Sequence, residues 1–227
     1  GLRLHQHIGK PASPVVKKGD RVLAGQIIAE AGGFVSANIV SSVSGTVKAV
    51  EPRKNASGGS AMAIVVENDG EYTLAEGVGV ECDTNGLTGQ EILSKVQKAG
   101  IVGMGGAGFP THVKLTVKTP EKIDYVIANG AECEPYITCD DQLMRTKAAE
   151  IVEGMEYMLR LFPNAKGVVV VENNKPEAIA AMEQACQGHD RVYVQPVKTK
   201  YPQGGERSIW QSRRPSGLRK TRFSSNS

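Results

Sequence analysis

Three short stretches of this 227-residue sequence contain glycines, carboxylates and amides at spacings that suit the binding of a flat, polar ligand. The first runs from Gly103 to Thr111, where four glycines in six positions let the backbone approach a ligand closely. Lys114 follows and adds a cation suited to a phosphate or an electron-rich ring edge. A tight turn is the other interpretation, because the run has neither the setting of a dinucleotide fingerprint nor the Gly-Lys-Ser/Thr ending of a phosphate-binding loop.

The second and third stretches each follow an expected strand. The second, from Asn129 to Pro135, contains the carboxylates of Glu132 and Glu134, and the third runs from Tyr201 to Glu206. Ligands of open α/β sheets collect beyond the carboxyl ends of the strands, so we expect all three stretches to meet at one rim of a parallel sheet. Taken singly, the second stretch also fits a solvated acidic loop, and the third fits a turn with one carboxylate.

The four cysteines stand apart from one another in the sequence. No two of them have the Cys-x-x-Cys spacing that zinc and iron–sulfur sites use. We interpret them as ordinary reduced thiols, and we predict no metal ligand and no catalytic side chain in this chain.

Helices alternate with strands from about residue 84 onward. Thr88 and Glu91 have the spacing of a capping box, and Gly100 is placed to end the helix that follows. Pro176 suits the first turn of a later helix. Further expected elements are strands at 124–128, 167–171 and 192–194, and helices at about 141–161 and 176–185. This order predicts a doubly wound, Rossmann-like α/β domain.

The first 80 residues have a different pattern, in which short apolar segments are separated by Gly turns. Small β units of this kind resemble the barrel sandwich of biotinyl and lipoyl carrier domains. Residues 31–47 contain no lysine, so a swinging-arm role is not expected. We predict an all-β barrel-sandwich domain over 1–80, an incomplete α/β domain over 81–208, and a tail over 209–227 that is either a solvated basic segment or not native sequence.

Charge and hydropathy exclude several classes of function. The formal net charge is +3, yet five basic residues and no acidic one fall within 211–227, so the rest of the chain is mildly acidic. Aromatic residues make up only 5% of the chain, which disfavours nucleic-acid binding. No apolar run is long enough to cross a membrane, and we expect this piece to be soluble.

The three stretches together resemble the RnfC family, whose members are the NADH- and flavin-binding subunits of the Rnf ion-translocating electron-transport complex. Gly-Gly-Ala-Gly-Phe-Pro-Thr-His-Val-Lys at 105–114 and Asn-Gly-Ala-Glu-Cys-Glu-Pro-Tyr-Ile-Thr at 129–138 match its typical wording, and 200–208 also fits. The same stretches are similar to the flavin loops of the NADH-binding subunit of respiratory complex I. The barrel ahead of the flavin unit is a feature of RnfC.

The resemblance implies a set of residues that hold FMN: Gly105, Gly106, Gly108, Lys114, Asn129, Glu132 and Glu206. Glu132 would lie beside the isoalloxazine ring and help to set its potential. Phe109 and Glu134 would contact NAD(H), the substrate that exchanges a hydride with FMN. The resemblance also implies two 4Fe-4S clusters bound further along, other Rnf subunits and ferredoxin as partners, and a peripheral place on the cytoplasmic face of the cell membrane.

The sequence also departs from the family. The strand and the Asn-bearing loop that complete the flavin phosphate site should follow Ser208, where Ser- and Arg-rich sequence stands instead, and no Cys-x-x-Cys-x-x-Cys run is present. The chain is therefore expected to be an N-terminal fragment that binds FMN weakly or not at all and passes no electrons. The alternatives are a cobalamin reductase of bacterial microcompartments, which has the same plan, and a non-enzymatic assembly module.

Overall fold

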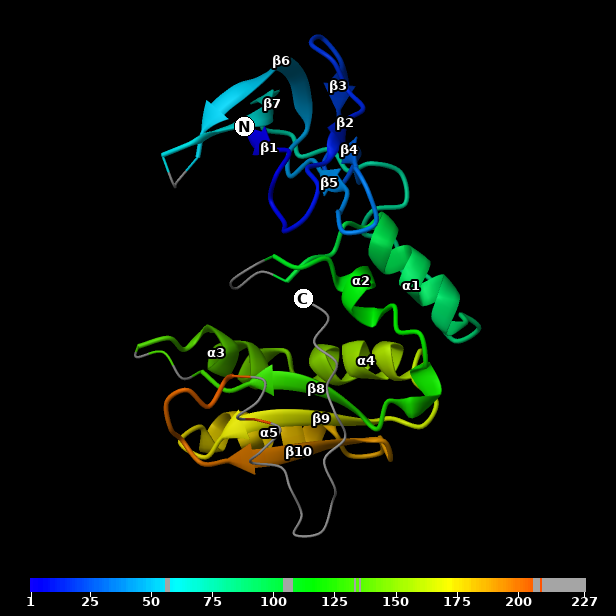
Figure 1. The fold of residues 1–227 in the computed structure, drawn as a ribbon, viewed down its shortest axis with the longest axis vertical. Helices are drawn as coiled ribbons and strands as arrows, with labels where there is room; N and C mark the ends of the chain where they lie inside the picture. Colours follow the sequence, from blue (N-terminus) through cyan, green and yellow to red (C-terminus); the bar gives the residue numbers. More distant parts are fainter. Residues whose placement is uncertain (56–57, 104–107, 133, 135, 206–208, 210–227) are drawn as a thin grey trace. The chain divides into compact units, whose positions relative to one another are not determined.

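A computed structural model describes residues 1–55, 58–103, 108–132, 134, 136–205 and 209. The chain divides into two compact units, Gly1–Lys118 and Thr119–Ser227, and each is described by itself (Figure 1). The fold class expected from the sequence is confirmed, since antiparallel β-structure is followed by a parallel sheet with helices. The predicted domain ranges, 1–80, 81–208 and 209–227, stay a prediction.

Two antiparallel sheets make up the β-structure of the first unit. One has the strand order β1-β7-β6-β3 and the other β2-β4-β5. The long hairpin of β6 and β7 has a bulge between Val47 and Ala49, where the strand bends. The strands are β1 (Leu2–Arg3), β2 (Ser13–Pro14), β3 (Arg21–Val22), β4 (Ile27–Glu30), β5 (Ile39–Val40), β6 (Gly45–Lys54) and β7 (Ser60–Asn68).

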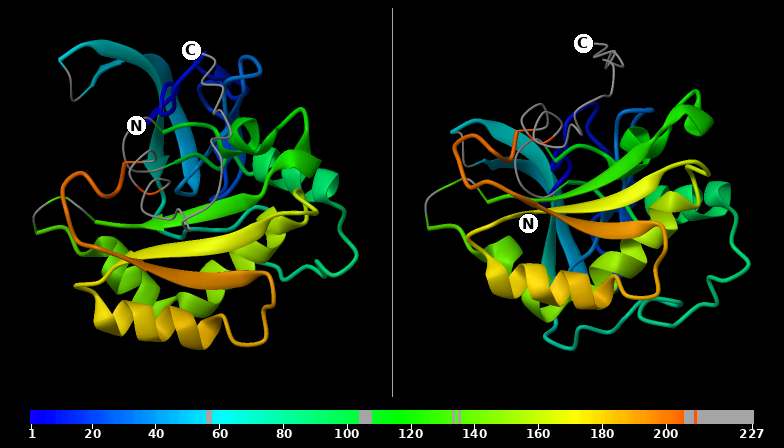
Figure 2. Two further views of the ribbon diagram at one scale, coloured as in Figure 1. Left: turned by 60° about the horizontal axis from the view of Figure 1, so that its bottom comes forward. Right: turned by 90° about the horizontal axis from the view of Figure 1, so that it is seen from below.

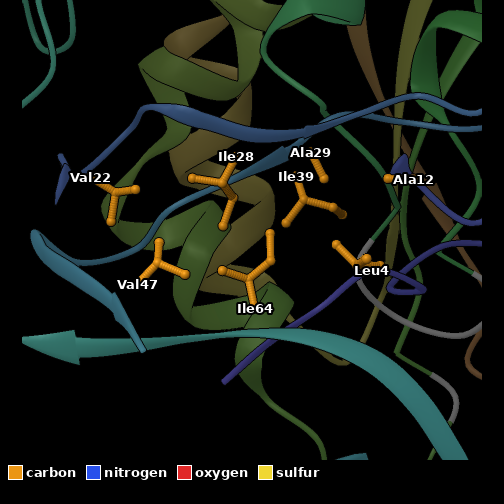
Figure 3. Packing of buried hydrophobic residues seen from close by; sticks show 8 residues of the cluster. All are labelled: Leu4, Ala12, Val22, Ile28, Ala29, Ile39, Val47 and Ile64. Atoms are coloured by element: carbon orange, nitrogen blue, oxygen red, sulfur yellow. The ribbon is translucent and has the colours of Figure 1, made fainter. Parts of the chain in front are cut away.

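Aliphatic side chains from both sheets form the core of this unit (Figure 3). Ile28 and Ile64 are fully buried at its centre, and Leu4 is almost fully buried. Burying a side chain of this size contributes about 1.5–3 kcal/mol. The labelled cluster is Leu4, Ala12, Val22, Ile28, Ala29, Ile39, Val47 and Ile64.

Two helices complete the first unit, α1 (Gly89–Lys98) and α2 (Thr111–Leu115). The capping box predicted at the start of α1 is confirmed, because Thr88 Oγ1 accepts from the Glu91 N–H and the Glu91 carboxylate accepts from the Thr88 N–H. Gly100 follows the helix with φ +66°, as expected for a residue that ends a helix.

A three-stranded parallel sheet forms the second unit, with the order β10-β9-β8. The strands are β8 (Tyr125–Gly130), β9 (Lys166–Glu172) and β10 (Val192–Val197), after the short helix η1 (Pro120–Lys122). All three expected strands are thus present. Four consecutive valines of β9, from Val168 to Val171, are buried, which is typical of a central strand covered on both faces. Ile209 is also buried and packs with Val168 and Val170.

The helices of the second unit are α3 (Cys139–Thr146), α4 (Ala148–Leu159) and α5 (Pro176–Ala185). They pack against one another on one face of the sheet (Figure 2). The expected doubly wound arrangement, with helices on both faces, is therefore not found in the described part of the unit. The strand order runs in one direction without a reversal, and right-handed crossovers then keep every helix on the same side.

The single helix expected over about 141–161 is instead two helices, which meet at Lys147. Lys147 has φ −131° and ψ 28°, outside the helical region. The hydroxyl of the preceding residue, Thr146, donates to the Gln142 carbonyl one turn earlier, at 2.7 Å. Back-bonding of this kind is known to bend helices, and it accompanies the break.

Two strand glycines lie directly beneath methionines of the covering helices. A Cβ atom on Gly130 would lie 2.7 Å from the Met144 sulfur of α3 and 2.9 Å from the Val170 carbonyl oxygen of β9. A Cβ atom on Gly167 would lie 2.6 Å from Cγ of Met155 on α4. The missing side chains let α3 and α4 pack close to the sheet, and they bring the start of α3 near the end of β8.

A search for membrane spans in the described residues found no helix that combines the necessary length with the necessary hydrophobicity.

Candidate functional site

The carboxyl ends of the parallel strands place two of the three predicted stretches side by side. The Asn129 side-chain amide donates to the Gly204 carbonyl at 2.9 Å, and its Oδ1 atom accepts from the Ala131 N–H at 3.2 Å. Asn129 therefore ties the loop after β8 to the loop after β10. In the latter loop the Tyr201–Pro202 peptide bond is cis, and Gln203 is fully buried.

Glu132 binds the first turn of α3 instead of pointing into solvent. Its Oε1 atom accepts from the Asp140 N–H at 2.7 Å, and its Oε2 atom accepts from the Asp141 N–H at 3.2 Å. The residue that precedes α3, Thr138, makes no capping bond with its side chain. Glu132 thus takes the place of a helix cap from outside the helix, where a negative charge also favours the helix dipole.

Two further groups reach the same carboxylate. The Cys139 thiol donates to Oε1 at 3.5 Å, and the Lys175 ammonium donates to Oε2 at 3.3 Å. A carboxylate has about four acceptor positions, so all of those on Glu132 are used within the chain. The side chain is only 2% exposed. Glu132 can therefore act on a neighbouring ligand through its negative charge but has no acceptor position left for a hydrogen bond.

Several causes act on the pKa of Glu132. Burial raises this pKa, but the N–H groups of Asp140 and Asp141 and the donors on Cys139 and Lys175 outweigh burial, and the net result lies below the ordinary value. The carboxylate is thus held ionised, as hydrogen bonds to a charged form require.

Glu172 and Lys175 are functional candidates that the sequence analysis missed. Glu172 is the last residue of β9 and is 1% exposed, and Lys175 is the residue before α5. Burial raises the pKa of Glu172, Glu132 raises it further, and the Lys200 N–H and Lys175 act in the opposite direction. Neither carboxylate oxygen has a hydrogen-bond partner of normal geometry among the described residues. The rule that selected Asn129, a polar residue at the end of an apolar strand, also selects Glu172.

The side chains of Glu132, Cys139 and Asp140 could in principle bind a metal, since their ligand atoms lie within 4.8 Å of one another. We assign no metal here, because the oxygens of Glu132 already face backbone N–H groups. The hydrogen bond to Glu132, burial and the nearby carboxylates raise the pKa of the Cys139 thiol. Burial and the charge of Glu132 likewise raise the pKa of Asp140.

Beyond Glu132 the loop reaches solvent. Glu134 is exposed, and its carbonyl accepts from the Ile137 N–H at 3.4 Å. Tyr136 is fully exposed and has φ +66°, which is uncommon for an aromatic residue. The predicted contact of Glu134 with a nicotinamide nucleotide stays a prediction.

The glycine-rich stretch belongs to the first unit. Val102 and Pro110 form an antiparallel bridge, and the Gly103 N–H donates to the Phe109 carbonyl at 2.9 Å, so the two ends of the stretch are held side by side. Gly108 has φ +59°, and a Cβ atom there would lie 3.0 Å from the Gln6 carbonyl oxygen. Gly108 is therefore required by its own unit, whatever it binds.

The remaining predicted site residues are solvent-accessible or lie outside the residues that the structure describes. Phe109 is 38% exposed, and Lys114 lies exposed on α2. Gly105, Gly106 and Glu206 lie outside the described residues.

His112 is a buried polar residue of α2 that the sequence analysis did not select. It is 3% exposed, and its Nε2 atom has no hydrogen-bond partner in the part of the chain that the structure describes. Its ring meets that of Phe34 edge to face, with 6.4 Å between centroids. In the sequence, His112 comes two positions before Lys114.

Polar side chains with defined partners gather at the carboxyl edge of the sheet. Asn129 fixes two loops at that edge, and Glu132 supplies a charge whose hydrogen bonds are already satisfied. The buried carboxyl of Glu172 adds a group that can exist as a neutral acid.

Comparisons with known proteins identify two domains in the chain. The family model described as the Nuo51 FMN-binding domain matches residues 96–222, more than half of the chain, and the RnfC barrel sandwich hybrid domain matches residues 2–71.

Curated relatives match most of the chain. The C subunit of a Na(+)-translocating ferredoxin:NAD(+) oxidoreductase complex of Acetobacterium woodii is 44% identical over 203 residues, which cover 89% of this chain and 46% of that relative. The C subunit of the proton-translocating complex of Clostridium ljungdahlii is 44% identical over 208 residues, which cover 92% of this chain and 45% of that relative. The C subunit of an ion-translocating oxidoreductase complex of Pseudomonas aeruginosa is 42% identical over 210 residues, covering 92% and 27%.

The chain spans less than half the length of these curated relatives. Its two matched domains follow each other in the order expected from the sequence, with the barrel first. The chain therefore belongs to the Nuo51 FMN-binding domain family and carries, ahead of that domain, the barrel sandwich hybrid domain of RnfC.

Proposed function

We propose that this chain is the flavin- and NAD(H)-binding part of an electron-transport subunit in an ion-translocating ferredoxin:NAD oxidoreductase. The family and the names of the relatives support an electron-transfer role. Other subunits of the complex and ferredoxin would be its partners, and those subunits would hold it peripherally at the cytoplasmic face of the membrane. Iron–sulfur clusters of the same polypeptide would be bound outside this stretch.

The observation that carries the proposal is the polar edge of the parallel sheet. Asn129, near the end of β8, binds Ala131 in the loop after β8 and Gly204 in the loop after β10, and Glu132 in the loop after β8 is held ionised. This is the edge at which α/β sheets bind their ligands.

Bound FMN would supply the conversion of a hydride, a two-electron donor, into single electrons. The residues of the chain would position the ring and set the charge around it. The fixed negative charge of Glu132 would disfavour added negative charge on the ring and so lower its potential. Phe109 and Glu134, both accessible, would contact the nicotinamide nucleotide.

The test is an FMN titration followed by quenching of flavin fluorescence. Two proteins are compared: this chain, and a longer version in which the residues after 208 are replaced by the corresponding segment of the Acetobacterium woodii relative. We expect strong quenching with the longer version and weak or no quenching with the chain alone. Addition of NADH to the loaded longer version should bleach the flavin absorbance.

Asn129→Leu in the longer version should weaken FMN binding about tenfold, because it removes the bridge between two loops. Asn164→Leu is the matched control, since the Asn164 amide donates to a backbone carbonyl far from this edge, that of Glu121. An absence of quenching in both proteins would favour an inert assembly module and contradict the proposal.

A further inference from the structure

Two buried carboxylates lie near one ammonium group at the carboxyl edge of the parallel sheet, and the ammonium, that of Lys175, pairs with Glu132. The side chain of Glu132 is 2% exposed and that of its partner Lys175 is 16% exposed, while Glu172 as a residue is 1% exposed. A buried ion pair contributes to stability only if its remaining hydrogen-bonding positions are satisfied. Glu132 meets this condition, with its two backbone N–H donors, and Glu172 does not.

Lys175 and Glu172 form one local structure. Lys175 N–H donates to the Glu172 carbonyl at 3.0 Å, so a tight turn joins the end of β9 to the start of α5. The lysine side chain leaves this turn toward Glu132, which belongs to the loop after β8. The ion pair of Lys175 with Glu132 therefore connects the turn after β9 to the loop that leads into α3.

We propose that Lys175 and Glu172 are positioning residues for Glu132, in which Lys175 holds the Glu132 carboxylate on the first turn of α3 and Glu172 sets how firmly the ammonium stays there. With Glu172 as a neutral acid, the single ammonium belongs to Glu132 and the three side chains sum to zero charge. With Glu172 ionised, two carboxylates compete for the ammonium and the cluster carries one net negative charge.

The surroundings of Glu172 favour the neutral form. Burial and the charge of Glu132 raise its pKa, and the Lys200 N–H and Lys175 only partly oppose them. Asp140, on the first turn of α3, adds a further carboxyl group whose own pKa is raised by burial and by Glu132. Asp141 and the Cys139 thiol also bind or face Glu132.

The sign of the pH effect follows from the raised pKa. Between the pKa of Glu172 in the unfolded chain and its higher pKa in the fold, the folded state retains a proton that the unfolded state has lost. Stability from this group is complete below the unfolded pKa, and it is lost as the pH rises through the folded pKa. The hold of Lys175 on Glu132 should weaken over the same interval.

Hydrogen exchange of the Asp140 and Asp141 amides, measured by NMR on the ligand-free chain, reads this hold directly. Lys175→Met should lower their protection factors about tenfold, the loss expected for a hydrogen bond to a charged group, and Lys175→Arg should restore most of it. Across a pH series, the protection of these amides in Glu172→Gln should match the wild type at the acid end and exceed it at the alkaline end, where wild-type Glu172 has lost its proton.

Matched controls replace exposed residues of the same types. Lys147→Met removes a surface lysine that pairs with Glu150, and Glu67→Gln neutralises a surface carboxylate that pairs with Lys48. Neither substitution should change the protection factors of the Asp140 and Asp141 amides. Protection of Val169 in the centre of β9 reports general loosening of the fold.

The proposal is overturned if Lys175→Met leaves the protection factors of the Asp140 and Asp141 amides unchanged. It is also overturned if the variant lowers the protection factor of the Val169 amide by the same factor as theirs. It is also overturned if the effect of Glu172→Gln stays the same across the whole pH series.

The consequence for redox chemistry rests on the proposed function. In the longer, FMN-loaded version, Lys175→Met should move the flavin midpoint potential to a more negative value, because it removes a positive charge near Glu132. An unchanged potential would contradict the electrostatic part of the proposal. If no version binds FMN, the proposed function fails, and the exchange data on the ligand-free chain still decide the positioning role.

Discussion

The two units of this chain bury polar groups of different kinds. In the first unit, the buried polar residues that the structure describes are two histidines and three small neutral serines, and the serines are bound to nearby groups. Ser36, for example, donates to the Lys10 carbonyl at 2.7 Å and accepts from the Gly32 N–H at 2.9 Å. In the α/β unit, Glu132 and Glu172 are buried as acids, and Glu172 has no hydrogen bond of normal geometry to any described residue. Neutral, satisfied groups hold loops together at every pH, whereas buried acids make the stability of the α/β edge depend on pH.

The largest effect should come from removing the charged acceptor of the α/β unit. Glu132→Leu leaves the Lys175 ammonium and the α3 N–H groups without their acceptor, which should cost about 3 kcal/mol at pH 7. Because the pKa of Glu132 is lowered in the fold, its contribution is present above its ordinary value of 4.5 and is lost as the pH falls through the folded pKa. Urea unfolding at several pH values measures this. A cost that stays constant down to pH 3 would contradict the assignment.

A neutral group of the β unit should behave differently. Ser44 is fully buried, and its hydroxyl donates to Asp69 Oδ1 at 2.7 Å and accepts from the Thr73 N–H at 3.0 Å. Ser44→Ala should cost about 1–2 kcal/mol, because it leaves the Thr73 N–H without that acceptor. The cost should change little between pH 6 and pH 9 in the same urea experiments. A cost that rises or falls steeply over this range would remove the distinction between the units.

A smaller effect should be visible in thiol chemistry. The pKa of the Cys139 thiol is raised, first by its hydrogen bond to Glu132. Glu132→Gln should therefore make Cys139 react faster with iodoacetamide at pH 8, since the thiolate is the reactive form. Peptide mapping by mass spectrometry gives the rate, and the exposed Cys82 is the internal reference. An equal acceleration at both cysteines would indicate general loosening.

The smallest effect on stability should come from two tyrosines with positive φ, one in each unit. Tyr72 has φ +51° and its hydroxyl accepts from the Asn68 amide at 3.2 Å, whereas Tyr136 has φ +66° and is fully exposed. Tyr136→Ala should change stability by no more than about 0.5 kcal/mol. Tyr72→Phe should cost about 0.5–1 kcal/mol. A large loss for Tyr136→Ala in thermal melts would show that this side chain supports the fold.

Much of the fold was predictable because its signals are local. The capping box of α1 depends on two residues three positions apart, and β9 is a continuous run of valines. The break at Lys147 was not predicted, because apolar residues continue at helical spacing through it. The one-sided packing of the helices depends on strand order, which local patterns do not contain.

The site was only partly predictable for the same reason. Asn129 and Glu132 follow a strand and were selected by that rule. The sequence gives no indication that Glu132 would bind the N–H groups of residues eight and nine positions later, or that Lys175 would reach it from another element. Glu172 could have been found from its place at the end of β9, but its burial could not.

The methionines that pack on Gly130 and Gly167 have a consequence for how this protein would respond to oxidation. Met144 and Met155 fill the space that two missing side chains leave, and both are buried. Conversion of either thioether to a sulfoxide adds a polar oxygen where the helix already touches the sheet. For a protein proposed to work with reduced flavin, which generates peroxide when it meets oxygen, damage at these two sulfurs would lift α3 and α4 from the strands.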